Sequence, residues 1–274
     1  DHRAGLLRKP WYRRILYYCT RVLPEAAAYR RADAAIVLNR AEQEFLGPRT
    51  RLLRTIPHGV LRERWEQAPP PDVPRGAGML FSGTWHTGKG IHYLAEAYRL
   101  LHARGVSIPM TLLSGMEDGP EFANEERWIR RYFAPACQAG LTVLRRSQDQ
   151  NEVFALYRSH DLLVCPSSTE GFGMVVLEAM SQRLPVVCSR AAGAAELLED
   201  DRDALLVAPR DAAALAAALE RLWLDPALRR RLAEAGHARL AELTWSHAAA
   251  ATQEVYRALR QRASGAPSRH ALTP

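Results

Sequence analysis

A glycine-containing loop with one lysine, FSGTWHTGKG at residues 81–90, has the composition of a phosphate-binding loop. It follows an apolar run and precedes a helical pattern, so it is expected at a strand-to-helix junction. Glycines let backbone N–H groups approach an anion closely, and a helix N-terminus favours negative charge. Lys9 and Lys89 are the only lysines among 37 Lys and Arg residues, which indicates a need for a compact ammonium in this loop. An ordinary exposed lysine on a turn is the alternative, and the loop is not a Walker A sequence.

A second junction, PSSTEGFGMVVLEAM at residues 166–180, carries two glutamates within a glycine-rich turn and the helix after it. The free N–H groups at the start of that helix would point at a sugar or a phosphate. Glu178, one turn into the helix, is suited to accept both hydroxyls of a ribose, and Glu170 to contact a transferred sugar. A surface glutamate and a second one that stabilises the helix dipole are the alternative. The candidate binding groups of this turn belong to Gly171, Phe172, Gly173 and Met174.

Two weaker junctions complete the set. SGMEDGP at residues 114–120 could approach a nucleotide, although a plain turn is the preferred interpretation. RAAGAAE at residues 190–196 contains Gly193 and Glu196, and a capping carboxylate accounts for it at least as well as a ligand contact.

All four junctions belong to a regular alternation of short apolar runs and helical patterns. Strands are expected at residues 79–83, 110–115, 141–144, 162–167, 185–189 and 205–209. Helices are expected at 91–103, 125–138, 152–159, 174–182, 194–198 and 212–224. Consecutive strand–helix units with nearly all-apolar strands predict an α/β fold with a doubly wound parallel sheet. In such sheets ligands bind at the carboxyl ends of the strands, where the strand order reverses.

Composition divides the chain into predicted domains. The proline-rich stretch QAPPPDVPRGAG is expected to be a linker. Strand candidates at 34–39 and 52–57 suggest part of another α/β domain before it. The predicted parts are a remnant of that domain at 1–66, the linker at 67–78, a ligand-binding domain at 79–243, a final helix at 244–263 and a flexible tail at 264–274.

The net charge of +7 is concentrated in residues 1–64. A basic segment with interleaved aromatic residues, at 8–21, is expected to contact an anionic membrane surface, with a solvated basic helix as the alternative. Nucleic acid is not the expected partner. No apolar stretch reaches the length of about 18 residues that suggests a spanning helix. The four cysteines show no metal-ligand spacing, and two of them lie in apolar runs. A cytoplasmic protein, peripheral on the inner membrane face if the basic segment binds lipid, is therefore expected.

The sequence EGFGMVVLEAM at residues 170–180, followed by LPVVCS at 184–189, resembles the signature of retaining glycosyltransferases of family 4. IPHGV at 56–60 and TWSHAAAATQEVY at 244–256 are similar to that family's two interdomain crossings. The resemblance implies the two-domain GT-B fold, with the complete Rossmann-like sheet as its C-terminal domain and residues 1–66 as the remnant of its N-terminal acceptor domain. The family's E-x7-E motif falls on Glu170 and Glu178. The family's diphosphate-binding arginine is replaced by Thr84.

The resemblance also implies an activity. The expected reaction transfers a sugar, hexose-like, from a UDP- or GDP-sugar to a glycan or lipid-linked acceptor with retention of configuration, in polysaccharide or glycolipid biosynthesis. Lys89, Gly83, Thr84 and the turn at 171–174 would hold the diphosphate without a metal or other cofactor. A non-catalytic nucleotide-sugar-binding module, or a related epimerase or phosphorylase, are the alternatives. With an acceptor domain expected before Asp1, the isolated chain is expected to bind nucleotide diphosphate weakly and to transfer no sugar.

Overall fold

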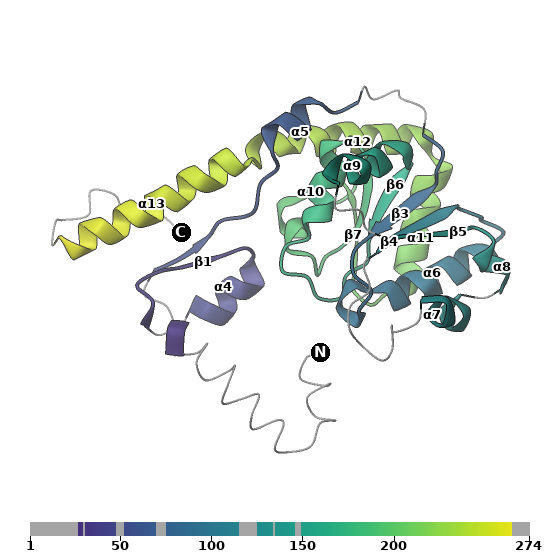
Figure 1. The fold of residues 1–274 in the computed structure, drawn as a ribbon, viewed down its shortest axis with the longest axis horizontal. Helices are drawn as coiled ribbons and strands as arrows, with labels where there is room; N and C mark the ends of the chain where they lie inside the picture. Colours follow the sequence, from purple (N-terminus) through teal and green to yellow (C-terminus); the bar gives the residue numbers. More distant parts are fainter. Residues whose placement is uncertain are drawn as a thin grey trace, which may run out of the picture. The chain divides into compact units, whose positions relative to one another are not determined.

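The computed structural model describes residues 27–29, 31–47, 52–69, 75–114, 125–133, 135–145 and 149–264. The chain forms two compact units (Figure 1). The larger unit contains residues 58–245, and the smaller combines the chain up to residue 57 with the chain from residue 246. The basic segment at 8–21, residues 115–120 of the SGMEDGP turn and most of the C-terminal tail lie outside the described residues.

The larger unit is built on a six-stranded parallel sheet with the order β5-β4-β3-β6-β7-β8. The chain lays down β3, β4 and β5 in one direction and then returns to the other side of β3 for β6, β7 and β8. The strand order therefore reverses between β3 and β6, and a doubly wound parallel sheet is confirmed. The strands are β3 (Met79–Ser82), β4 (Met110–Ser114), β5 (Leu141–Arg145), β6 (Leu162–Cys165), β7 (Val186–Ser189) and β8 (Leu205–Val207).

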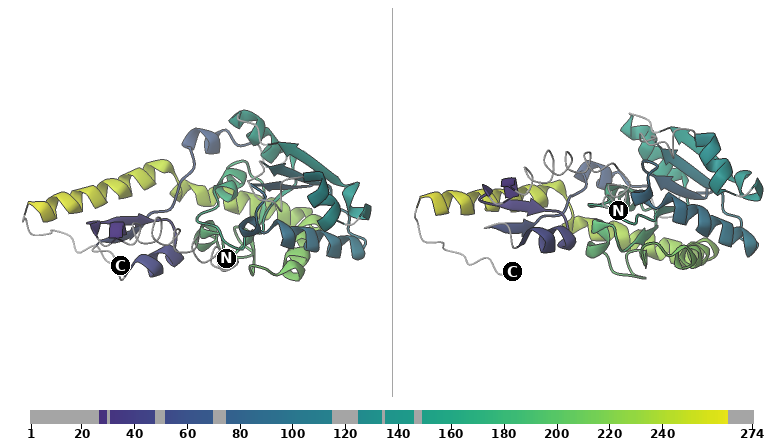
Figure 2. Two further views of the ribbon diagram at one scale, coloured as in Figure 1. Left: turned by 60° about the horizontal axis from the view of Figure 1, so that its bottom comes forward. Right: turned by 90° about the horizontal axis from the view of Figure 1, so that it is seen from below.

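Helices cover both faces of this sheet (Figures 1 and 2). The α-helices of the larger unit are α5 (Arg62–Glu66), α6 (Ile91–Ala103), α7 (Glu125–Tyr132), α8 (Pro135–Gln138), α9 (Gln150–Ser159), α10 (Met174–Ser181), α11 (Ala212–Leu224) and α12 (Pro226–Arg239). Short 3-10 helices are η3 (Thr87–Lys89), η4 (Gly193–Leu197) and η5 (Leu240–Glu242). α6 packs against α11, whereas α10 packs against β6, β7 and α9.

Two helix predictions need correction. The single helix expected at 125–138 is divided into α7 and α8, because Pro135 cannot donate the backbone hydrogen bond that a continuous helix requires. The α-helix expected at 194–198 is instead the 3-10 helix η4, which is confined between extended residues at both ends.

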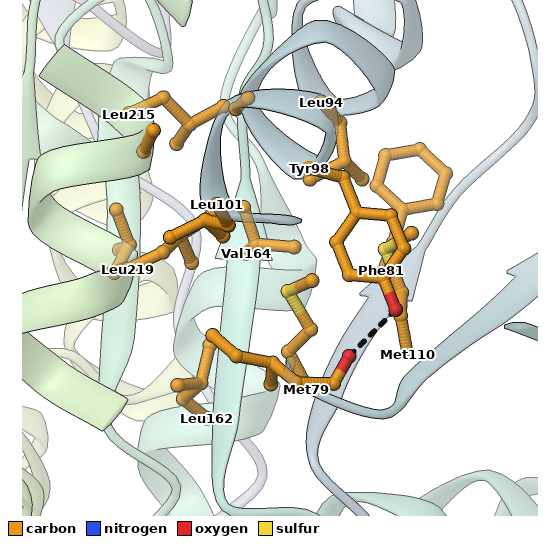
Figure 3. Close-up of a cluster of buried hydrophobic side chains, with 14 of the residues drawn as sticks. Met79, Phe81, Leu94, Tyr98, Leu101, Met110, Leu162, Val164, Leu215 and Leu219 are labelled. Atoms are coloured by element: carbon orange, nitrogen blue, oxygen red, sulfur yellow. Dashed lines mark hydrogen bonds between the residues drawn. The ribbon is translucent and has the colours of Figure 1, made fainter. Parts of the chain in front are cut away.

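The core of the larger unit lies between the sheet and the α6/α11 layer (Figure 3). Alternate strand residues point to this face, and they meet Leu94, Leu101, Leu215 and Leu219 of the two helices. Tyr98 of α6 is fully buried in this cluster, and its hydroxyl donates to the backbone oxygen of Ile108 at 2.7 Å. Burial raises the pKa of Tyr98 to about 12.

Among its described residues, the smaller unit contains a pair of parallel strands, the helix α4 (Arg40–Leu46) and most of the helix α13 (Trp245–Ala263). β1 (Ala35–Val37) pairs with β2 (Leu53–Thr55), which confirms strands within both predicted stretches. α4 begins after Asn39, whose side chain accepts from Glu42 N at 2.8 Å. The long helix α13 contributes Val255, which packs with Leu52 and Ile56 on either side of β2. None of the described helices is long and apolar enough to cross a membrane.

Candidate functional site

The loops that follow β3 and β6 lie together at the point where the strand order reverses. The backbone oxygen of Gly88 accepts hydrogen bonds from Ser168 N at 2.8 Å and from Thr169 N at 3.1 Å. Gly90 has a φ of +73°, and a Cβ added there would lie 1.9 Å from the backbone oxygen of Pro166. Only glycine fits this left-handed conformation and this close approach without displacement. The two junctions identified in the sequence are therefore parts of one site.

An ion pair joins the charged residues of these two loops. Lys89 Nζ donates to Glu170 Oε2, and the two side chains are only 26% and 13% exposed. The buried Ser167 hydroxyl donates to the same carboxylate oxygen at 3.2 Å. Glu170 is thus held by two donors, while the ammonium of Lys89 has three N–H donors in total. Lys89 can therefore donate to an anionic ligand while it keeps its ion pair with Glu170.

The N-terminus of α10 begins beside this pair. Gly173 is its left-handed N-cap with a φ of 92°, and no side chain caps the helix. A Cβ added at Gly173 would lie 3.4 Å from Glu170 Cγ, so the helix start is adjacent to the acidic residue. Within the described part of the chain, the amides of Phe172, Gly173 and Met174 donate no hydrogen bond. These amides, with the helix dipole, favour an anion at this position.

Phe172 anchors the turn that carries those amides. Its side chain is buried and lies edge-on to His58, with ring centroids 5.1 Å apart. Its backbone oxygen accepts from Ala194 N at 2.7 Å, which ties the turn to the RAAGAAE loop. The glycines on either side of Phe172 allow backbone conformations that other residues rarely adopt. The buried ring of Phe172 anchors the turn in one of these conformations.

Glu178 lies one turn into α10, as predicted. Its Oε2 atom accepts a hydrogen bond at 2.8 Å from the hydroxyl of Tyr157, which is on α9. Its Oε1 atom has no donor among the described residues. Glu178 is therefore oriented from one side and keeps acceptor capacity on the other.

Arg75 fastens the C-terminal ends of α9 and α10 to each other. Its guanidinium donates to the backbone oxygens of Tyr157, in the last turn of α9, at 2.7 Å and of His160, just after α9, at 3.1 Å. It also donates to those of Gln182 at 2.8 Å and Arg183 at 3.1 Å, just after α10. A cation at these positions satisfies orphan carbonyls and complements both helix dipoles. Burial lowers the pKa of Arg75. These four hydrogen bonds, called the Arg75 clamp, hold the C-terminal ends of α9 and α10 together. The two helices carry Tyr157 and Glu178.

The thiols near the site are structural. Cys165 and Cys188 are paired in register on β6 and β7, and both are buried free thiols, as is Cys137. The contact with Cys165 and burial raise the pKa of the Cys188 thiol. The prediction that the two strand cysteines pack as small hydrophobic residues is confirmed.

Comparison with known families identifies the larger unit. The family model described as "Glycosyl transferases group 1" matches residues 66–239, which is more than half of the chain. The chain belongs to this glycosyl transferase family.

Two proteins of similar sequence have names that agree with the family assignment. A glycogen synthase from Mycobacterium tuberculosis is 29% identical over 242 residues, which cover 86% of this chain and 57% of that protein. A D-inositol 3-phosphate glycosyltransferase from Pseudarthrobacter chlorophenolicus is 33% identical over 189 residues, or 68% of this chain and 44% of that protein. The chain thus spans about half of the length of these curated relatives.

A solved structure extends the similarity to the fold. The sucrose-phosphate synthase from Thermosynechococcus elongatus superposes with a TM-score of 0.72 at 28% identity, covering 89% of this chain and 62% of that one. The predicted fold class, an α/β protein of the GT-B type, is confirmed.

Most of the site residues predicted from the sequence lie near Lys89 and Glu170, whereas Glu178 and Glu196 have other surroundings. Gly83 lies close to Lys89, since a Cβ added at Gly83 would be 3.9 Å from Lys89 Cδ. Thr84 follows it and is partly buried. The turn at 171–174 borders Glu170, whereas Glu178 contacts Tyr157 instead. Glu196 is exposed on η4. The binding roles of all these residues stay predictions.

Several residues of the site were not found from the sequence. His86 caps η3 by accepting from Gly88 N at 3.0 Å. Ser167, three positions before Glu170, could have been found from its place in the same turn. Tyr157 and Arg75 had no local signal, because their partners lie on other elements of the unit.

Proposed function

We propose that this chain supplies the donor-binding half of a retaining glycosyltransferase that uses a UDP- or GDP-sugar. The observation that carries the proposal is the convergence of Lys89, Glu170 and the uncapped start of α10 where the strand order reverses. Open α/β sheets bind their ligands at this kind of position. Membership of the glycosyl transferase family supports the same conclusion.

The diphosphate is proposed to bind between Lys89 and the amides of residues 172–174. An ammonium and a helix N-terminus both act on the negative charge that develops as the bond between sugar and phosphate breaks. In this arrangement the charge-neutralising role belongs to protein groups, so we propose donor binding that needs no metal. Gly83 lies beside Lys89, and it and the following residue Thr84 are proposed to contribute to the phosphate-binding loop.

The two glutamates have different proposed tasks. Glu170, which borders the helix start, is proposed to hold the sugar, and Glu178 to accept from the ribose. Retention of configuration is proposed from the motif that contains both residues. The acceptor is proposed to be a glycan or a lipid-linked sugar, and a cytoplasmic location is consistent with the buried free thiols of the described chain.

Titration calorimetry with UDP and GDP, in buffer containing EDTA, tests donor binding by this chain. One of the two nucleotides is expected to bind the wild type. Glu178→Ala is expected to weaken that nucleotide by about tenfold or more, because losing a hydrogen bond to a charged group costs about 1.5–3 kcal/mol. Glu199→Ala is the matched control, since Glu199 forms an ion pair with Arg202 in which both side chains are exposed.

Two results would contradict this proposal. If the wild type binds neither nucleotide, the proposed donor site is wrong. If Glu178→Ala binds the nucleotide as tightly as the wild type, the proposed ribose contact of Glu178 is wrong. The proposed contact between Lys89 and the diphosphate is not affected by that result.

A further inference from the structure

Tyr157 has an unusual partner for a fully buried tyrosine. Its side chain is 0% exposed, yet its hydroxyl donates at 2.8 Å to the carboxylate of Glu178, which is only partly buried. A buried phenol needs an acceptor. Tyr98, equally buried in the same unit, uses a backbone oxygen. The acceptor of Tyr157 is instead the side chain proposed above to contact the ribose.

We propose that Tyr157 is a positioning residue that orients Glu178 and thereby sets the preference for a ribose over a deoxyribose. This inference rests on the proposed function. The terminal torsion of a glutamate is broad, so a free carboxylate samples many orientations. The Tyr157 hydroxyl holds Oε2 and leaves Oε1 as the acceptor for a sugar hydroxyl.

The surroundings make Tyr157 a rigid support. It lies in the last turn of α9, and its ring meets Phe154 edge-on with centroids 5.8 Å apart. Its own backbone oxygen accepts from Arg75, which also binds the backbone after α10. The helices α9 and α10 are therefore connected twice, by the bond between the Tyr157 hydroxyl and the Glu178 carboxylate and by the backbone contacts of Arg75. A fixed donor on a fixed helix can impose one orientation on Glu178.

The test compares Tyr157→Phe with the wild type in titrations of UDP and GDP and of their 2′-deoxy and 3′-deoxy counterparts. The wild type is expected to prefer the ribonucleotide by about tenfold or more over the form lacking the contacted hydroxyl. Tyr157→Phe is expected to weaken the ribonucleotide about fivefold and to leave that deoxy form within about twofold. In the Glu178→Ala background, Tyr157→Phe is expected to have no further effect on affinity.

Tyr98→Phe is the matched control. It removes one hydroxyl from an equally buried ring in the same unit, but its acceptor is Ile108 O. It is expected to lower the melting temperature about as much as Tyr157→Phe and to leave ribose selectivity unchanged. Melting curves by circular dichroism establish that both variants fold.

The possible failures are distinguishable. If Tyr157→Phe weakens the ribonucleotide and the deoxy forms equally, or changes neither, the positioning role is wrong while donor binding stands. If the wild type binds UDP or GDP but does not discriminate against any deoxy form of that nucleotide, the ribose contact and the role of Tyr157 are both wrong. If the wild type binds no nucleotide, the proposed function fails together with this inference.

Discussion

Replacing Lys89 by alanine is expected to weaken binding of the nucleotide diphosphate by a hundredfold or more. Two effects add. The variant loses a hydrogen bond between charged groups, which is worth about 1.5–3 kcal/mol. It also leaves Glu170, whose side chain is only 13% exposed, as an unpaired negative charge beside an anionic ligand. Titration calorimetry on the purified chain measures the loss. Where sugar transfer is assayed, turnover should fall by about a hundred- to a thousand-fold.

The double variant Lys89→Ala/Glu170→Gln separates these two effects. Neutralising Glu170 removes the stranded charge, so the double variant should bind the diphosphate about tenfold more tightly than Lys89→Ala alone. Arg104→Ala provides a control, because it breaks the 2.8 Å pair with Glu220, in which both side chains are more exposed. It should leave affinity unchanged. Binding by Lys89→Ala within about threefold of wild type would contradict the phosphate assignment at Lys89.

Replacing Arg75 by alanine is expected to lower the free energy of unfolding by about 3 kcal/mol or more. The substitution removes four hydrogen bonds to backbone oxygens at the ends of α9 and α10. Those oxygens would lose both their donor and the cation that complements the two helix dipoles. Urea unfolding followed by circular dichroism measures the change.

Arg75→Lys tests whether geometry or charge matters more at this position. An ammonium keeps the charge but lacks the planar fork that spans oxygens on two helix ends, so it should recover less than half of the lost stability. Arg190→Ala is the control, since Arg190 forms a 2.6 Å pair with Asp200 in which both side chains are largely exposed. Such pairs contribute about 0–1 kcal/mol. A loss at Arg75→Ala no larger than at Arg190→Ala would refute the clamp.

Local sequence patterns were enough to predict the strands and most of the helices of the larger unit, and the positions of the loops that carry Lys89 and Glu170. Apolar runs such as residues 79–82 are continuous because both faces of a parallel strand are covered, and this signal is local. α6 and α11 have the predicted bounds because their patterns repeat with the helical period. Lys89 and Glu170 could be identified as candidate site residues because each lies in a loop that follows a predicted strand. The break at Pro135 was readable too, although a continuous helix was expected there.

Which of these elements are neighbours could not be predicted from local patterns and became clear from the packing of the folded chain. Lys89 and Glu170 are 81 residues apart, and they pair because β6 returns to the side of β3, which no local pattern specifies. The contacts of Tyr157 with Glu178 and of Arg75 with two helix ends join residues 21 to 108 positions apart. Periodicity reports which face of an element is apolar. The partner of a buried polar group is decided by packing between elements, because any acceptor within reach can satisfy a donor that water no longer reaches.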